Sequence, residues 1–209
     1  MRFLITAGPT REPIDPVRYL SNRSSGKMGY ALAKAARNAG HEVTLISGPV
    51  SIPAPESTDL VRVETAVEMF DAVKIRINEA DVAIFCAAVA DYRIKEISAE
   101  KIKKNDEEVT LTLMQNPDIL GSARSEFGFT GRLVGFAAET ENVEANARGK
   151  LERKGCDFVV ANDVSRRDIG FDRDANEVIL FAADGSTMRL DRASKDEIAK
   201  AIIQHILTR

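Results

Sequence analysis

Short apolar runs alternate with stretches of helical periodicity along this chain of 209 residues. The first run, Phe3–Ala7, predicts a β-strand, and apolar residues recur at the spacing of an α-helix between Gly26 and Gly40. Three later runs are apolar throughout, which is typical of parallel strands covered on both faces. The predicted strands lie at 3–7, 42–46, 60–63, 82–86, 133–137 and 158–161. One predicted helix starts at Ser24–Gly26 and has its apolar positions at Met28, Leu32, Ala35, Ala36 and Ala39. The others start at Thr65 or lie at about 116–127 and 142–154.

The C-terminal part of the chain has a different pattern. Two short strands, Glu177–Phe181 and Thr187–Leu190, flank Asp184-Gly185, which is a hairpin turn signal. Isoleucines four residues apart, from Ile198 to Ile206, predict a final helix. The alternation as a whole predicts an α/β fold: a Rossmann-like, doubly wound, mostly parallel sheet with a C-terminal β-hairpin plus helix. We expect residues 1–209 to form a single domain.

One segment, at about 92–115, interrupts the alternation. It contains a charged run, Glu100–Lys104, followed by Val109–Leu113, where apolar and polar residues alternate and predict a half-buried strand. We interpret the segment as an inserted flap or dimerisation strand. It follows the carboxyl end of a central strand, where open α/β sheets bind ligands. A plain solvated charge run is the alternative for its lysines.

The loop between the first strand and the first helix is a candidate for chemistry. Pro13 and Pro16 argue against regular structure in it, and loops of this length in compact domains are usually functional or disordered. We expect Ser24 or Ser25 to cap the helix. Its free amides and Lys27 would then form an anion site suited to phosphate. An ordinary strand–loop–helix connection is the alternative.

Composition narrows the classes of function. A formal net charge of −3 gives no general attraction to nucleic acid or to a membrane, so local lysines would have to bind an anionic substrate. The glycines match neither the dinucleotide fingerprint nor a P-loop. Cys86 and Cys156 lie in apolar segments and are interpreted as buried thiols of a cytoplasmic protein. His41 and His205 lack the neighbours of a zinc site, and no arrangement for covalent catalysis is evident.

Small and polar residues follow the buried strands, whose carboxyl ends would meet at one edge of the sheet. Ala87–Asp91 would let a ligand approach the backbone closely and accept hydrogen bonds from it. Asn116 is predicted to cap a helix with Pro117 at its first position, and the amides there could bind phosphate. Lys150 and Lys154 share one helix face. Tight packing, structural capping and solvated surface are the alternatives for these three features.

Six motifs occurring in order resemble bacterial phosphopantothenoylcysteine synthetase, the amide-forming enzyme of coenzyme A biosynthesis. The opening motif is TAGPTREPIDPVRYLSNRSSGKMG, from Thr6 to Gly29. The others are CAAVADYR (86–93), EKIKK (100–104), NPDI (116–119), GFAAET (135–140) and ANDVS (161–165). They are distributed from Thr6 to Ser165, and the resemblance extends over essentially the whole chain. Six motifs in order are far more specific than any one of them alone.

The resemblance implies an amide ligase, unrelated to the ATP-grasp enzymes, that joins 4′-phosphopantothenate and L-cysteine. The pantothenate carboxylate would attack the α-phosphate of CTP, giving an acyl-cytidylate and pyrophosphate, and the cysteine amine would then displace CMP. Mg²⁺ would accompany the triphosphate. In many bacteria a flavin-dependent decarboxylase precedes this synthetase, and we expect this chain to be the stand-alone form, a cytoplasmic homodimer without flavin.

The resemblance also implies roles for particular residues. Asn22 would hold the acyl-cytidylate and assist its conversion. Lys101 on the flap would stabilise charge at the reacting phosphates, across a dimer interface. The metal ligands are not assigned. Nucleotide contacts would fall on Ala87, Ala88, Asp91, Lys101, Asn116, Pro117, Asp118, Ile119, Phe136, Lys150 and Lys154, and phosphate or substrate contacts on Gly8, Ser24, Ser25, Gly26 and Lys27.

Two alternatives of other classes stay open from the sequence. One is a nucleotide-binding regulatory domain without catalytic activity, which would leave Asn22 and the flap lysines without a role. The other is an NAD(P)-dependent oxidoreductase of Rossmann type, which the missing glycine fingerprint disfavours. Residue chemistry alone does not choose CTP over ATP.

Overall fold

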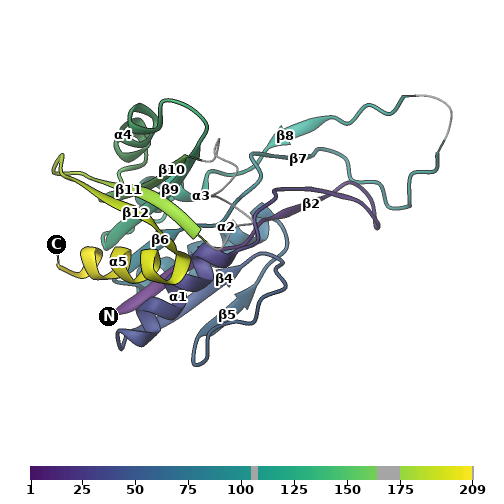
Figure 1. The fold of residues 1–209 in the computed structure, drawn as a ribbon. Helices are drawn as coiled ribbons and strands as arrows, with labels where there is room; N and C mark the ends of the chain where they lie inside the picture. Colours follow the sequence, from purple (N-terminus) through teal and green to yellow (C-terminus); the bar gives the residue numbers. More distant parts are fainter. Residues whose placement is uncertain (105–107, 164–174, 209) are drawn as a thin grey trace.

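A computed structural model describes residues 1–104, 108–163 and 175–208, and its centre is an eight-stranded sheet in the order β12-β11-β10-β9-β6-β1-β4-β5 (Figure 1). Six strands run parallel, and a C-terminal antiparallel hairpin extends one edge. The predicted fold class is therefore confirmed. The parallel strands are β1 (Arg2–Ala7), β4 (Glu42–Ser47), β5 (Asp59–Arg62), β6 (Val82–Phe85), β9 (Arg132–Glu139) and β10 (Phe158–Asp163), and the hairpin is β11 (Ala175–Ala182) and β12 (Thr187–Ser194).

Helices cover both faces of this sheet. Residues of the central strand alternate between them, so Ile5 packs with the helices of one face and Leu4 with those of the other. No helix among the described residues is both long and apolar enough to cross a membrane. On one face lie α1 (Lys27–Asn38) and α5 (Lys195–Thr208), and on the other α2 (Ala66–Arg76), the short 3-10 helix η1 (Ile77–Glu79), α3 (Ile119–Ser125) and α4 (Val143–Lys154).

The start of α1 differs from the prediction. Neither Ser24 nor Ser25 caps the helix, because the N-cap residue is Gly26, which has a left-handed backbone (φ 77°) and makes no side-chain cap bond. Ser24 Oγ instead accepts a hydrogen bond from the Gly26 amide at 3.3 Å. A Cβ on Gly26 would lie 2.6 Å from Val50, so glycine meets both the conformation and the space. Of the apolar positions at helical spacing, Ala39 is exposed just beyond the end of the helix.

Two other local predictions are corrected. The loop with Pro13 and Pro16 contains a short hairpin, β2 (Arg11–Pro13) and β3 (Tyr19–Ser21), because Pro13 takes the end position of the ladder, where its missing amide is tolerated. Asn116 does not cap α3. Asp118 does, accepting the Gly121 amide at 2.9 Å, while the Asn116 side chain donates to the Ala90 carbonyl at 2.8 Å.

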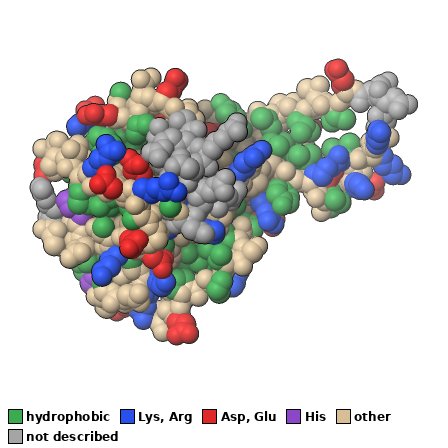
Figure 2. Space-filling view, viewed as in Figure 1, with side chains coloured by type: hydrophobic (Ala, Val, Ile, Leu, Met, Phe, Trp, Pro, Cys, Tyr) green, Lys and Arg blue, Asp and Glu red, His purple; other side chains and the backbone are tan. Residues whose placement is uncertain are grey.

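The inserted segment forms an arm that extends away from the sheet (Figure 1). It begins and ends in a two-stranded pair, β7 (Tyr92–Ile94) and β8 (Leu113–Gln115). The prediction of a half-buried strand at Val109–Leu113 is wrong for the single chain, since residues 108–115 are exposed on both sides and Val109 keeps 60% of its surface accessible. Hydrophobic side chains and, farther out, Lys and Arg side chains are visible along the arm in Figure 2.

Gly29 determines how closely α1 approaches β1. A Cβ at this position would lie 2.5 Å from Ala7 Cβ, so we expect Gly29→Ala to lower the free energy of unfolding by about 1–3 kcal/mol through overpacking. Gly149→Ala in α4 is the control, because its Cβ would meet only the movable end of Arg153 and should stabilise the helix by up to about 1 kcal/mol. Equal effects of the two substitutions in urea unfolding would contradict the close approach.

Candidate functional site

The candidate site lies where the sheet reverses its strand order. β1 is flanked by β4 on one side and by β6 on the other, so the connections after β1 and β6 diverge at the carboxyl edge and leave a crevice there. The two connections are hydrogen-bonded through their backbones: the Ala88 amide donates to the Gly8 carbonyl at 2.9 Å, and the Thr10 amide donates to the Ala88 carbonyl at 3.2 Å. The floor of the crevice is thus fixed by main-chain contacts.

Two buried threonines complete that floor. The Thr6 hydroxyl accepts the Ala87 amide at 3.2 Å, and the Thr10 hydroxyl accepts the Ala90 amide at 3.0 Å. Both threonines are at most 1% exposed. The Asn22 side chain donates to the Ala88 carbonyl at 3.2 Å, so the predicted catalytic asparagine is attached to the same loop.

The first cavity at this edge, of about 640 Å³, lies over β6, α3 and α4. Most of the predicted nucleotide contacts line it, together with Thr6, Met69 and Tyr92, which the sequence analysis did not single out. The predicted residues that the structure brings together here are Ala87, Asp91, Asn116, Pro117, Asp118, Ile119, Phe136, Lys150 and Lys154.

Lys150 and Lys154 give this cavity its positive charge. Lys150 Nζ donates to the Phe136 carbonyl at 2.5 Å, and burial lowers the pKa of Lys150. Lys154 pairs with Asp118, and this pair and the Gly121 amide lower the pKa of Asp118 although its burial alone would raise it. The carboxylate that caps α3 therefore also orients a lysine toward the cavity.

A second cavity of about 360 Å³ adjoins the first. The two share Ala87, Val89, Asp91, Phe136 and Lys150. The second is lined in addition by Asn22, Ala88 and the predicted phosphate segment Ser24–Lys27, which begins α1. Cys86 also lines it, and burial raises the pKa of this thiol to about 12, so it is not a nucleophile at neutral pH.

Two residues of the second cavity were missed by sequence reasoning. Lys195, at the start of α5, is only 7% exposed, and Asn176, in β11, is only 4% exposed, yet both line the cavity. Neither has a local sequence signal, because their position depends on the packing of the C-terminal hairpin and helix against α1. Asn162 of the ANDVS motif lines the same cavity, whereas Val164 and Ser165 lie outside the described residues.

Two predicted contacts are not in either cavity. Gly8 is buried below the crevice, where its left-handed backbone (φ 74°) and its carbonyl hold the loop to Ala88. The geometry therefore does not indicate a direct contact between Gly8 and a ligand. Lys101 is exposed on the arm and lines neither cavity.

The joined cavities are suited to an extended anion. Backbone amides at the start of α1, with Lys27, line one cavity, Lys154 lines the other, and Lys150 lines both. The described residues contain no cluster of three or more His, Cys, Asp or Glu that could hold a metal ion. Asp91 lines both cavities, and a single carboxylate with phosphate oxygens and water is a usual ligand set for Mg²⁺. The residues present thus fit a phosphate-bound magnesium ion.

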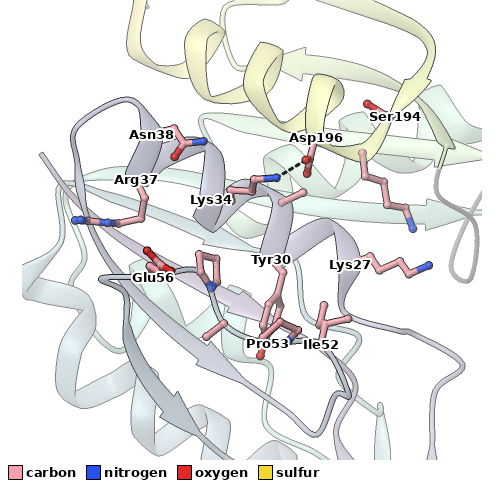
Figure 3. Close-up of a pocket in the computed structure, with 14 residues that line it drawn as sticks. Lys27, Tyr30, Lys34, Arg37, Asn38, Ile52, Pro53, Glu56, Ser194 and Asp196 are labelled. Carbon is pink, nitrogen blue, oxygen red and sulfur yellow. Dashed lines mark hydrogen bonds and ion pairs between the residues drawn. The ribbon is translucent and has the colours of Figure 1, made fainter.

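A larger groove of about 870 Å³ lies elsewhere, between α1, residues 52–56 and the start of α5 (Figure 3). An ion pair between Lys34 and Asp196, with 2.6 Å between Nζ and Oδ2, crosses it. Of the predicted site residues only Lys27 lines this groove. It runs along the outer flank of α1 rather than at the carboxyl ends of the strands, so its volume does not make it the candidate site.

Known proteins resemble this chain over nearly its whole length. Residues 1–209 match the family described as "DNA/pantothenate metabolism flavoprotein C-terminal domain". The coenzyme A biosynthesis bifunctional protein CoaBC of Vibrio vulnificus is 49% identical over 208 residues, which is 99% of this chain and 52% of that protein. The chain therefore spans about half the length of such relatives.

Two solved structures are also similar. The crystal structure of the C-terminal domain of CoaBC has a TM-score of 0.84 and 41% identity, and the match covers 99% of this chain and 94% of that one. A Cab2 mutant in complex with phosphopantothenate-cysteine has a TM-score of 0.79 over 100% of this chain and 85% of that one. At 19% identity this second match shows a common fold alone.

The threonine hydroxyls under the crevice can be tested without a ligand. Thr10→Val keeps the shape but leaves the Ala90 amide without its acceptor, so the free energy of unfolding should fall by about 1–3 kcal/mol and exchange of the Ala90 amide hydrogen should accelerate. Thr44→Val in β4 is the matched control, since this threonine is only partly buried and its change should stay within about 0.5 kcal/mol. Unchanged Ala90 exchange in Thr10→Val would contradict the assignment.

Proposed function

Because the chain belongs to the family of the DNA/pantothenate metabolism flavoprotein C-terminal domain, we propose that it is a phosphopantothenate–cysteine ligase of coenzyme A biosynthesis. It joins 4′-phosphopantothenate and L-cysteine in an amide bond and consumes CTP to CMP and pyrophosphate. The observation that carries the proposal is the pair of adjoining cavities, which meet at Ala87, Asp91 and Phe136.

The first cavity accommodates the nucleotide. Its size, about 640 Å³, and its two lysines suit a nucleoside triphosphate, with Lys150 and Lys154 supplying donors and positive charge. The second cavity then accommodates the reacting phosphate and the phosphopantothenate carboxylate, beside Asn22 and the start of α1. Asp91, which lines both, is the residue that would hold a Mg²⁺ ion bound to the phosphates; this ion neutralises their charge when present.

In the first step a carboxylate oxygen of 4′-phosphopantothenate bonds to the α-phosphorus of CTP while the bond to the bridging oxygen breaks and pyrophosphate leaves. The protein's task is to align these atoms and to stabilise negative charge. The amides at the start of α1, Ser24 and Lys27 line the second cavity and can do so.

In the second step the cysteine amine attacks the acyl carbon, CMP leaves and a proton is released from nitrogen. Asn22 is held by its hydrogen bond to the Ala88 carbonyl, and its side-chain oxygen remains available to the acyl-cytidylate or to the incoming amine. The predicted role of Asn22 in holding and converting the intermediate is consistent with this geometry.

Lys101 acts, in our proposal, in the partner subunit of a cytoplasmic homodimer. Its own chain carries it on the arm that extends away from the sheet (Figure 1), and it lines neither cavity. The same arm exposes Val109, Leu111, Leu113 and Met114, each at least 38% accessible. Exposed apolar groups of this kind favour burial against a second copy of the chain.

Nucleotide dependence tests the proposed reaction. We expect pyrophosphate release to require 4′-phosphopantothenate together with CTP, and addition of cysteine to yield phosphopantothenoylcysteine by mass. ATP should support the reaction poorly. Tight NAD(P) binding without turnover of CTP would instead favour an oxidoreductase, and nucleotide binding without any turnover would favour a regulatory domain.

The two predicted catalytic residues can be tested singly and as a mixture. Asn22→Asp should form acyl-cytidylate but transfer it poorly to cysteine, and Lys101→Gln should slow the first step on the order of 10²-fold.

After the two variants are mixed and re-associated, a heterodimer has one site with both residues intact if the arm acts on the partner. Activity should then recover to about a quarter of the wild-type value, since half of the dimers carry one good site of two. If each arm served its own chain, no recovery would occur.

A further inference from the structure

Asp15 is a buried carboxylate that lines neither cavity, and none of the steps above uses it. It lies between β2 and β3, and its side chain is fully buried. Oδ1 accepts the amides of Val17 and Arg18 at 2.9 and 2.8 Å, which closes a local turn. Oδ2 accepts the Arg18 guanidinium, with Nη2 at 2.5 Å and Nε at 3.0 Å.

Oδ2 also makes a contact that is not local. It accepts the amide of Ile102, 87 residues away along the chain, at 3.1 Å. Arg18 Nη2 donates to the Ile102 carbonyl at 2.9 Å, so both main-chain polar groups of Ile102 are held by the β2–β3 hairpin. The Ser98 amide donates to the Ile14 carbonyl at 3.1 Å on the same side of the arm.

Ile102 is the residue next to Lys101. Its main-chain amide and carbonyl are both held by one ionic pair, in which the Asp15 side chain is buried and that of Arg18 is half exposed. Lys101 itself and Lys103 are exposed on the arm. The Arg18 guanidinium lowers the pKa of Asp15 well below its usual range, so the carboxylate stays ionised near neutral pH. A charged, two-sided anchor of this kind restricts the backbone more than one neutral hydrogen bond does.

We propose that Asp15, acting through Arg18 and the main chain of Ile102, is a positioning residue for Lys101, joining the β2–β3 hairpin and the arm into one unit that presents this lysine to the reacting phosphates. This inference rests on the proposed function. It concerns the rate of the first chemical step and not the binding of the nucleotide, whose predicted contacts lie in the two cavities.

Asp15→Asn keeps one oxygen of the carboxylate and replaces the other with an NH2 group. The asparagine oxygen can keep the turn amides of Val17 and Arg18, while its NH2 group replaces Oδ2 and faces the Ile102 amide as a second donor. We expect kcat for acyl-cytidylate formation to fall by about 10-fold or more, with KM for CTP changed less than about 2-fold. Asp184→Asn is the matched control, because Asp184 accepts the Ser186 amide in a similar turn of the β11–β12 hairpin and should leave both constants unchanged.

A double variant distinguishes positioning from general damage. If Asp15 works through Lys101, Asp15→Asn combined with Lys101→Gln should be no more than about 2-fold slower than Lys101→Gln alone. Multiplicative losses, or a rise in KM for CTP with kcat unchanged, would overturn the proposal.

Amide hydrogen exchange gives a readout that does not depend on activity. In the wild-type protein the Ile102 amide should exchange at least about 10-fold more slowly than the amides of Lys103 and Lys104, and Asp15→Asn should remove this protection. Fast exchange of Ile102 in the wild type would overturn the anchor even if the ligase assay succeeds. An inactive wild type with a protected Ile102 would instead overturn the proposed function and leave the anchor supported.

Discussion

The hydrogen-bonded junction between the segments after β1 and β6 is the constraint on which the site depends. At the switch point the two connections leave the sheet on opposite faces, so their backbone amides lose strand partners in a partly buried place, where unpaired polar groups are costly. Thr6 and Thr10 supply hydroxyl acceptors to the amides of Ala87 and Ala90, and the Gly8 carbonyl accepts Ala88. Small side chains on this loop then keep the crevice open above a rigid floor.

Charge is arranged locally in a protein that carries a net charge of −3. Four lysines reach the two cavities from α1, α4 and α5, and each of them is partly or largely buried. Burial lowers the pKa of Lys150, which means that the folded protein bears a cost for keeping this cation in place. An anionic ligand offsets that cost, so the same burial that destabilises the empty site strengthens the attraction for phosphate.

The sequence predicted the layers of the fold well because they depend on periodicity, which is local. The uninterrupted apolar runs at β6, β9 and β10 indicated central strands, and the structure has them there. The predictions were wrong or incomplete where a backbone angle, or a contact with a residue distant in the sequence, determines the local structure. Gly26 takes the N-cap position from Ser24 and Ser25 because of its left-handed conformation, and the Asn116 side chain is occupied by the Ala90 carbonyl. Lys195 has no local signal, since only the packing of α5 against α1 brings it to the cavity.

The apolar pattern of the arm is not explained by the contacts within a single chain. Alternating apolar residues at Val109–Leu113 would normally indicate a buried face, yet in the single chain both faces are exposed. A ladder of three residue pairs, as in β7 and β8, is marginal by itself, so the arm needs further support. Asp15 and Arg18 hold the arm at the main chain of Ile102, and in the proposed homodimer a second copy would cover its apolar side chains. The two supports act on different parts of the arm, and together they would determine where Lys101 lies, which neither the sheet nor the cavities can do.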